Sequence, residues 1–266
     1  MKVVTLIENT SGKMELACEH GLSLYIETGE YHILFDAGQS GAFADNAEKL
    51  GIDLRKVDFA VLSHGHYDHG GGLARFLEIN STAPVYLRKE AFEPHFNAAS
   101  KNIGLDRKLL DSGRLVFVDE DTEIVPGIRL LSCNDRKPLH RTDGCGMQTL
   151  CEERLIPDDF RHEQYLIVAE KGKTICFSGC SHKGILNIVD WLRPDVLFGG
   201  FHFMKLDLSG GDSRILSAAA HGLRSYPTAY YTGHCTGTAQ FEFLKRCMGQ
   251  QLNALAAGVI VQLPEY

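Results

Sequence analysis

Residues Ser63–Gly72 read SHGHYDHGGG and directly follow the apolar run FAVL at positions 59–62. Within six residues of this segment stand four side chains of metal-binding types: His64, His66, Asp68 and His69. Imidazole nitrogen and carboxylate oxygen suit Zn²⁺ and similar cations. The first two histidines can face one ion from an extended turn, while the aspartate and the third histidine can reach a second. Because the interleaved glycines permit a tight turn into a helix, the segment predicts a metal site rather than a histidine-rich surface loop.

Two later segments repeat the order of strand, glycine and metal-binding side chain. FSGCSHKG at 177–184 offers Cys180 as a candidate thiolate ligand and His182 as a candidate imidazole ligand. TGHCTG at 232–237 offers His234 as a further candidate ligand. The alternatives are a small buried cysteine at position 180, since free cysteine is often buried, and a helix-capping or substrate-contacting histidine at position 182.

The remaining histidines stand in different contexts. GGFH at 199–202 follows a predicted strand, so His202 can bind substrate or donate a proton, or it can be a hydrogen-bonded structural histidine. His140 is an intermediate case. Five others have no such context and are interpreted as surface or packed residues: His20, His32, His95, His162 and His221.

The order of predicted elements indicates an α/β fold with two packed sheets and outer helices. Alternation of apolar residues predicts strands with one buried face formed by Leu22, Leu24, Ile26, Ile33 and Phe35. The interval 134–163 is charged and punctuated by Cys, Pro and Gly, so it is predicted to be a long loop. The chain contains no repeat or linker-like tract, and we expect residues 1–266 to form one domain.

Composition narrows the classes of function. Twenty-seven Lys and Arg against 34 Asp and Glu give a net charge of −7, which provides no general attraction to nucleic acid or anionic membranes. No apolar run approaches the ~18 residues of a membrane span, and the first residues do not resemble a signal peptide. Eight cysteines in 266 residues are too few for a disulfide scaffold. We therefore expect a cytoplasmic protein with reduced thiols.

The H-x-H-x-D-H motif, the ligands at strand ends and the segment FDAG at 35–38 together resemble the metallo-β-lactamase fold superfamily. Within it, the segments GCSHKG, GGFH and GHCTG are similar to the branch of 7,8-dihydropterin-6-yl-methyl-4-(β-D-ribofuranosyl)aminobenzene 5′-phosphate synthase-like proteins. The resemblance implies a four-layer αββα sandwich with a dinuclear metal site between the sheets.

Carried over by position, the resemblance implies one metal bound by His64 and His66 and a second bound by Asp68, His69 and His234. This chain departs from the superfamily pattern at two places. Cys180 stands where a bridging aspartate is usual, and the usual upstream histidine that completes the first metal is not evident from the sequence between residues 70 and 175. His182, or else His140, is the replacement. The expected cofactors are two divalent ions, zinc in the first place and iron or manganese as alternatives.

Such a centre favours hydrolysis or transfer at phosphate, ester or lactone groups. Asp68 can orient the attacking water. Lys183, at a predicted helix N-terminus, can contact a phosphate or be an ordinary solvated lysine. The sequence thus predicts a metal-dependent hydrolase or transferase that acts on a small phosphorylated molecule. The alternatives are a general phosphodiesterase or lactonase, and a non-catalytic metal or ligand sensor.

Overall fold

The computed structural model describes residues 1–142 and 144–263, and its two main sheets have seven strands each. The first sheet has the order β17 (Ile260–Gln262), β1 (Lys2–Ile7), β2 (Ser23–Glu27), β3 (His32–Phe35), β4 (Phe59–Val61), β5 (Val85–Leu87) and β7 (Leu115–Phe117). The second has the order β16 (Leu252–Ala254), β15 (Ala229–Thr232), β14 (Val196–Phe198), β13 (Lys173–Phe177), β12 (Tyr165–Glu170), β9 (Ile128–Leu131) and β8 (Thr122–Val125).

Alternate residues of the central strands enter different cores, because side chains along a strand point to opposite faces. In β2, Leu24 and Ile26 pack between the two sheets, whereas Tyr25 packs toward the outer helices. The inner core contains every residue expected on the buried face: Leu22, Leu24, Ile26, Ile33 and Phe35. This core is the contact surface that holds the two sheets together.

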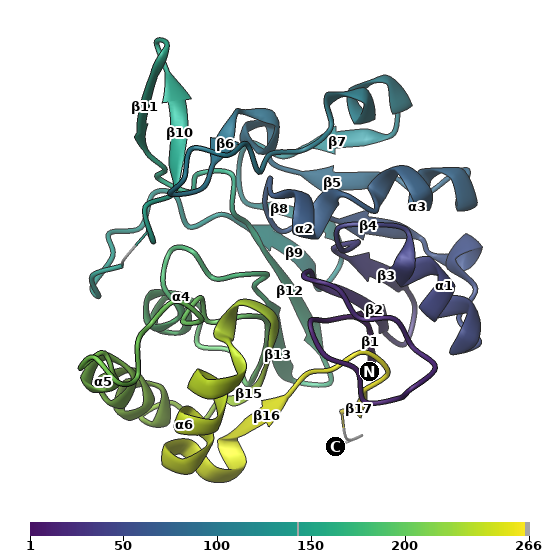
Figure 1. Cartoon of the computed structure of the whole chain (residues 1–266). Coiled ribbons are helices and arrows are strands. Elements are labelled where there is room, and N and C mark those ends of the chain that lie inside the picture. The colour runs from purple at the N-terminus through teal and green to yellow at the C-terminus, as the bar shows by residue number, and fades with distance from the viewer. Residues whose placement is uncertain (143, 264–266) are drawn as a thin grey trace.

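Helices cover the outer face of each sheet (Figure 1). The first sheet carries α1 (Ala42–Lys49) and α3 (Leu73–Ile79), and the second carries α4 (Ile185–Leu192), α5 (Ser213–Arg224) and α6 (Thr238–Met248). The expected αββα sandwich is therefore confirmed. Shorter helical segments are α2 (Tyr67–Gly70), η1 (Leu54–Lys56), η2 (Lys89–Phe92), η3 (Arg107–Ser112), η4 (His234–Thr236) and η5 (Gly249–Gln251). Within the described ranges, none of the helices has the length and apolar character needed to traverse a lipid bilayer.

Parallel strands bring the functional segments to one edge of the sandwich. β3 and β4 run parallel in the first sheet, and β13, β14 and β15 run parallel in the second. The segments that begin at Ser63, Ser178, Gly199 and Gly233 follow the carboxyl ends of β4, β13, β14 and β15. Because the carboxyl ends of neighbouring parallel strands lie at the same edge, these segments meet there.

The prediction of a structureless loop over 134–163 is wrong in part. Residues 148–157 form a hairpin of β10 (Gln148–Cys151) and β11 (Arg154–Pro157), and β10 also pairs with β6 (His95–Phe96). The hairpin projects from the body of the molecule (Figure 1). Its two-residue turn, Glu152–Glu153, has φ values of 45° and 64°. Two-residue hairpin turns with positive φ favour Asn and Gly. Because this turn consists of two glutamates, the sequence does not predict the hairpin.

The inner core supplies a test of the two-sheet interface. Phe177 is 0% exposed and its ring lies 5.7 Å from that of Phe35 and 5.1 Å from that of Phe198. We expect Phe177→Ala to lower the free energy of unfolding by about 3–5 kcal/mol through lost burial and a cavity. Phe117, which is 45% exposed, is the matched control, and its replacement by alanine should cost about 1 kcal/mol. Urea denaturation measures both; equal losses would contradict this packing.

Candidate metal centre

The histidine motif passes from the end of β4 into α2, and its turn is packed against the neighbouring segment. A Cβ at Gly65 would lie 2.3 Å from the carbonyl oxygen of Ala91, so the turn accepts only glycine. This close approach keeps the motif at the sandwich edge. His64, His66 and His69 are buried there, each at most 3% exposed.

The carboxylate of Asp36, in the FDAG segment, fixes the orientation of two of these histidines. It accepts hydrogen bonds of 2.7 Å from the Ser63 backbone N–H, the Ser63 hydroxyl and His69 Nδ1. The Ser63 oxygen in turn lies 2.8 Å from His64 Nδ1. Because the serine proton is directed to the carboxylate, that oxygen accepts the proton of His64 Nδ1. Both histidines therefore present an Nε2 lone pair to the centre, the arrangement usual for metal ligands.

Four donors meet in a group that we call site B: Asp68, His69, Cys180 and His234. His69 Nε2 lies 3.2 Å from His234 Nε2 and 3.1 Å from Cys180 Sγ, and Asp68 Oδ2 lies 3.2 Å from His234 Nε2. Ligand atoms bound tetrahedrally to zinc at ~2.0–2.1 Å lie roughly 3.3 Å apart. The donor types and spacings of site B therefore fit a divalent cation.

The charges in site B favour a cation as well. Burial raises the pKa of Asp68, but neighbouring His69 and His234 outweigh burial and hold that pKa below its usual range. Burial lowers the pKa of His234, and the hydrogen bond with Asp68 reverses this and raises it to about 9. A cation bound between Asp68 and His234 would replace the proton that this raised pKa favours on His234.

Three imidazoles form a second group, site A, beside the first: His64, His66 and His182. His64 Nε2 lies 3.3 Å from His182 Nε2, and the His182 ring stacks on Phe160 at 4.7 Å between centroids. Burial lowers the pKa of each of the three histidines well below its usual value. Their rings are therefore neutral near pH 7, with lone pairs available for a cation.

Left-handed backbone conformations occur at four non-glycine residues around the centre. Asp36, Ser181, His202 and His234 have φ values of 57°, 60°, 57° and 48°. Side chains other than glycine rarely adopt this region, at a cost of about 1–3 kcal/mol each. The surrounding hydrogen bonds and packing hold these residues in place.

The structure thus brings together the residues expected as ligands: His64, His66, Asp68, His69, Cys180, His182 and His234. The alternative ligand His140 is exposed, and its backbone N–H is hydrogen-bonded to Asn187 Oδ1. His202, expected to act on substrate, lies beside the centre, 4.4 Å from His182 between ring centroids. His182 and His202 both line a cavity of about 780 Å³.

The expectation that Lys183 contacts a phosphate has to be corrected. Its ammonium group donates to Ser132 O at 2.8 Å, Asn134 Oδ1 at 2.6 Å and Glu163 O at 3.1 Å. An ammonium group has three hydrogens, and these three acceptors account for all of them. Lys183 therefore ties the strand-end segment to the rest of the protein and is not available to an anion.

Sequence reasoning missed three histidines that lie next to the centre. His20 Nε2 is 3.3 Å from Asp68 Oδ2, and His95 and His162 are buried near His66. These three come from segments with no metal-binding spacing, so nothing in the local sequence pointed to them. For Asp36 the sequence does carry a signal, because this carboxylate directly follows the strand that ends at Phe35.

Comparisons with known proteins agree with this geometry. The model of the metallo-beta-lactamase superfamily matches residues 17–132. The 7,8-dihydropterin-6-methyl-4-(beta-D-ribofuranosyl)-aminobenzene-5'-phosphate synthase of Methanocaldococcus jannaschii is 30% identical, over 98% of this chain and 96% of its own length. The chain therefore belongs to the metallo-β-lactamase superfamily and is a metal-dependent enzyme of that superfamily.

Solved structures show the same fold. The crystal structure of Tm1679, a metal-dependent hydrolase of the β-lactamase superfamily, aligns over the whole of both chains with a TM-score of 0.83 and 28% identity. Zn²⁺-bound PqqB from Methylobacterium extorquens aligns over 99% of this chain and 100% of its own, with a TM-score of 0.59 and 14% identity. At that identity, the second match supports the fold alone.

Asp36 provides a test of how the ligands are oriented. We expect Asp36→Asn to weaken metal binding about 10–100-fold, because the amide disturbs the acceptor that fixes His64 and His69. Metal affinity is measured by competition with a chelating dye, and thermal unfolding of the chelated protein checks the fold. Asp53→Asn, which alters an exposed carboxylate bound to Arg55, is the control. A folded Asp36→Asn variant with unchanged affinity would contradict the assigned role.

Proposed function

We propose that this member of the superfamily is a hydrolase or transferase with a dinuclear centre formed by sites A and B, and that it acts on a small phosphorylated molecule. The observation that carries the proposal is the position of Cys180. The Cys180 sulfur lies in one group with His64 of site A and His69 of site B. The ligand atoms of these three residues all lie within 4.8 Å of one another. A thiolate there can serve two cations at once, where the superfamily usually has a carboxylate.

Zinc is the cation best matched to this centre. Thiolate and imidazole donors suit zinc, whereas an oxygen-rich site would favour magnesium or manganese. Iron and manganese remain the alternatives for the same nitrogen and oxygen ligands. Two bound divalent cations lower the pKa of water and stabilise the attacking and leaving oxygens of a displacement.

The protein's own side chains then bind the substrate and control protons. Asn9 Nδ2 lies 3.3 Å from His20 Nδ1, so His20 Nε2 carries the proton that faces Asp68 at 3.3 Å and orients that carboxylate. His202 stands beside site A on the cavity wall, where its imidazole can donate a proton to a leaving group. We assign positioning of the attacking water to Asp68 and proton donation to His202.

The cavity beside site A supports a small organic substrate. Its volume of about 780 Å³ falls within the ~300–1,000 Å³ of small-molecule sites. Part of the cavity wall is apolar and aromatic and is formed by Phe201, Phe203 and Leu206. The guanidinium of Arg141, also on the wall, can bind a phosphate. The similar synthase of M. jannaschii is named for a pterin joined to an aminobenzene ribofuranosyl phosphate. A planar group with a phosphate ester is therefore the substrate class that we propose.

Metal content tests the dinuclear centre. Elemental analysis of protein purified without chelators should give about two ions per chain, falling toward one in Cys180→Ala. Cys176→Ala is the matched control, because Cys176 is a buried thiol in the core between β13 and the outer helices. If Cys180→Ala keeps its full metal content and affinity, the proposal that the Cys180 sulfur serves both cations is contradicted.

Kinetics test the role of His202. We expect His202→Ala to lower kcat for a phosphate ester about 10²–10⁴-fold with unchanged metal content, because general acid catalysis contributes that much. His221→Ala, at an exposed position of α5, should leave kcat unaltered. The assay compares phosphomonoesters with bis(p-nitrophenyl) phosphate and a homoserine lactone. Turnover of the last two alone would favour a general phosphodiesterase or lactonase and overturn the proposed substrate class.

A further inference from the structure

The side-chain amide of Asn9 contacts two histidine rings at the edge of site B. Asn9 comes soon after β1, which ends at Ile7, and it meets His234 from the second sheet and His20 from the loop before β2. Asn9 Oδ1 lies 2.9 Å from His234 Nδ1, and Asn9 Nδ2 lies 3.3 Å from His20 Nδ1. In each ring the other nitrogen, Nε2, faces Asp68. One amide thus contacts both rings on the sides turned away from that carboxylate.

Two backbone groups fix the orientation of the Asn9 amide. The Gly21 N–H is a donor, and it lies 3.2 Å from Asn9 Oδ1. The His234 carbonyl oxygen is an acceptor, and it lies 3.4 Å from Asn9 Nδ2. An amide rotated by half a turn would place donor against donor and acceptor against acceptor. The amide oxygen therefore faces His234 Nδ1, and the amide nitrogen faces His20 Nδ1.

This orientation requires opposite tautomers of the two rings. Asn9 Oδ1 is an acceptor, so His234 Nδ1 carries a proton and Nε2 is the nitrogen left for a cation. Asn9 Nδ2 is a donor, so His20 Nδ1 carries a lone pair. The proton of His20 is then on Nε2, which lies 3.3 Å from Asp68 Oδ2. Both hydrogens and both acceptor positions of the amide are used in these contacts.

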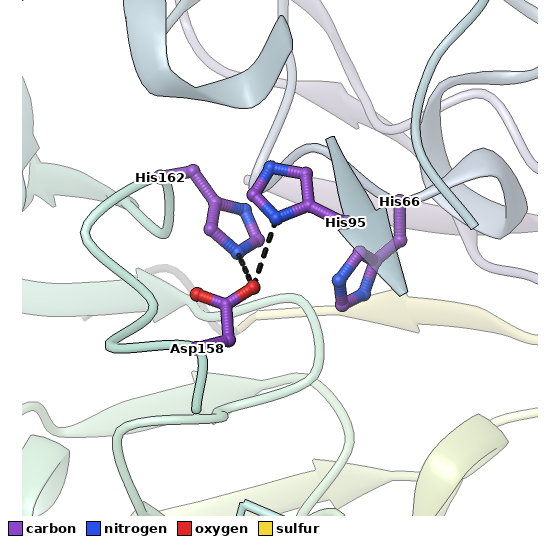
Figure 2. A group of neighbouring side chains, drawn as sticks. All are labelled: His66, His95, Asp158 and His162. Carbon is purple, nitrogen blue, oxygen red and sulfur yellow. Dashed lines mark hydrogen bonds and ion pairs between the residues drawn. The ribbon is translucent and has the colours of Figure 1, made fainter. Parts of the chain in front are cut away.

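A carboxylate at position 9 would not have this effect, as Asp158 illustrates beside His66. Figure 2 shows His95 Nδ1 and His162 Nε2 directed at one oxygen of Asp158, at 2.8 Å and 3.4 Å. An ionised carboxylate is an acceptor at both oxygens, so it favours a proton on every nitrogen that faces it. Asn9 combines an acceptor and a donor in one side chain. It can therefore bind one ring at a protonated nitrogen and the other ring at a lone pair.

The residues on either side of Asn9 hold it in place. The side chain of Glu8 is buried, and one of its oxygens accepts the His234 backbone N–H. The other oxygen accepts the backbone N–H and the hydroxyl of Thr10, each at 2.6 Å. The backbone of residues 8–10 is thereby fixed relative to His234, and the amide meets the ring without rearrangement.

We propose that Asn9 is a positioning residue of site B. It fixes His234 with Nε2 available to a cation, and it fixes His20 as a hydrogen-bond donor to Asp68. The inference rests on the proposed function, in which site B binds one of two cations. It adds a residue that acts on the centre through these two rings.

Three substitutions test the two contacts separately. Asn9→Leu removes both and should weaken the binding of one ion about 10–100-fold. Asn9→Asp keeps an acceptor for His234 and loses the donor to His20, so it should retain metal affinity and move the His20 proton to Nδ1. Asn253→Leu is the matched control, because Asn253 is also half-buried and donates to the Tyr230 carbonyl oxygen. Chelated protein is titrated with Zn²⁺ in competition with a chelating dye, and circular dichroism checks that each variant is folded.

The ring protons are observed by nuclear magnetic resonance of ¹⁵N-labelled protein, because the chemical shift of a ring nitrogen differs between a proton and a lone pair. His20→Gln and His234→Gln identify the signals. In the zinc-loaded protein we expect His20 to carry its proton on Nε2 and His234 to carry its proton on Nδ1. Asn9→Leu should lose these fixed tautomers, whereas a loss of stability alone would not change them in a folded variant.

Two results would overturn the proposal. One is a His20 ring that carries its proton on Nδ1 in the unaltered protein. The other is a folded Asn9→Leu variant with unchanged affinity and unchanged ring signals. If His234→Gln binds as many ions as the unaltered protein, the dinuclear centre is wrong. The ring signals of His20 and His234 in the chelated protein then support or overturn the role of Asn9 independently.

Discussion

The side chain of Asp36 accepts hydrogen bonds from the backbone and hydroxyl of Ser63 and from His69, and through Ser63 it also fixes His64. A carboxylate has no proton to give, so every ring nitrogen turned toward this network carries one. The opposite nitrogens of both histidines are left with lone pairs directed into the centre. Sites A and B each receive one of these rings, so one buried negative charge sets the direction from which each site would bind a metal ion.

The donors of the centre come from both halves of the sandwich. His64 and His69 follow a strand of the first sheet, whereas Cys180 and His234 follow strands of the second. No short segment supplies a complete set, so the ligands meet only when the inner core has joined the sheets. Cation binding is consequently coupled to folding, and a bound ion stabilises the interface between the sheets beyond its hydrophobic packing.

Much of this arrangement could be predicted from local sequence. Alternating apolar residues predict the strands, and metal-binding residue types at strand ends predict which side chains the structure groups as sites A and B. The failures have physical causes. The hairpin at 148–157 is stabilised by pairing with β6, a contact distant in sequence. The sequence suggests that Lys183 is free to bind a phosphate, because the residues that accept its hydrogen bonds lie in loops distant in sequence. His162 lies against the histidine motif at 64–69 because residues 158–164 fold back onto that motif. The spacing of residues in the sequence does not predict this contact.

The left-handed residues around the centre have a consequence for how this protein can be improved. At Ser181, His202 and His234 glycine would relieve backbone strain, yet two of these positions carry an imidazole to which we assign a role at the proposed centre. Glycine at these positions would therefore favour thermal stability, whereas histidine would favour turnover. Engineering of a more durable form should begin in the outer helices, where added stability does not compete with catalysis.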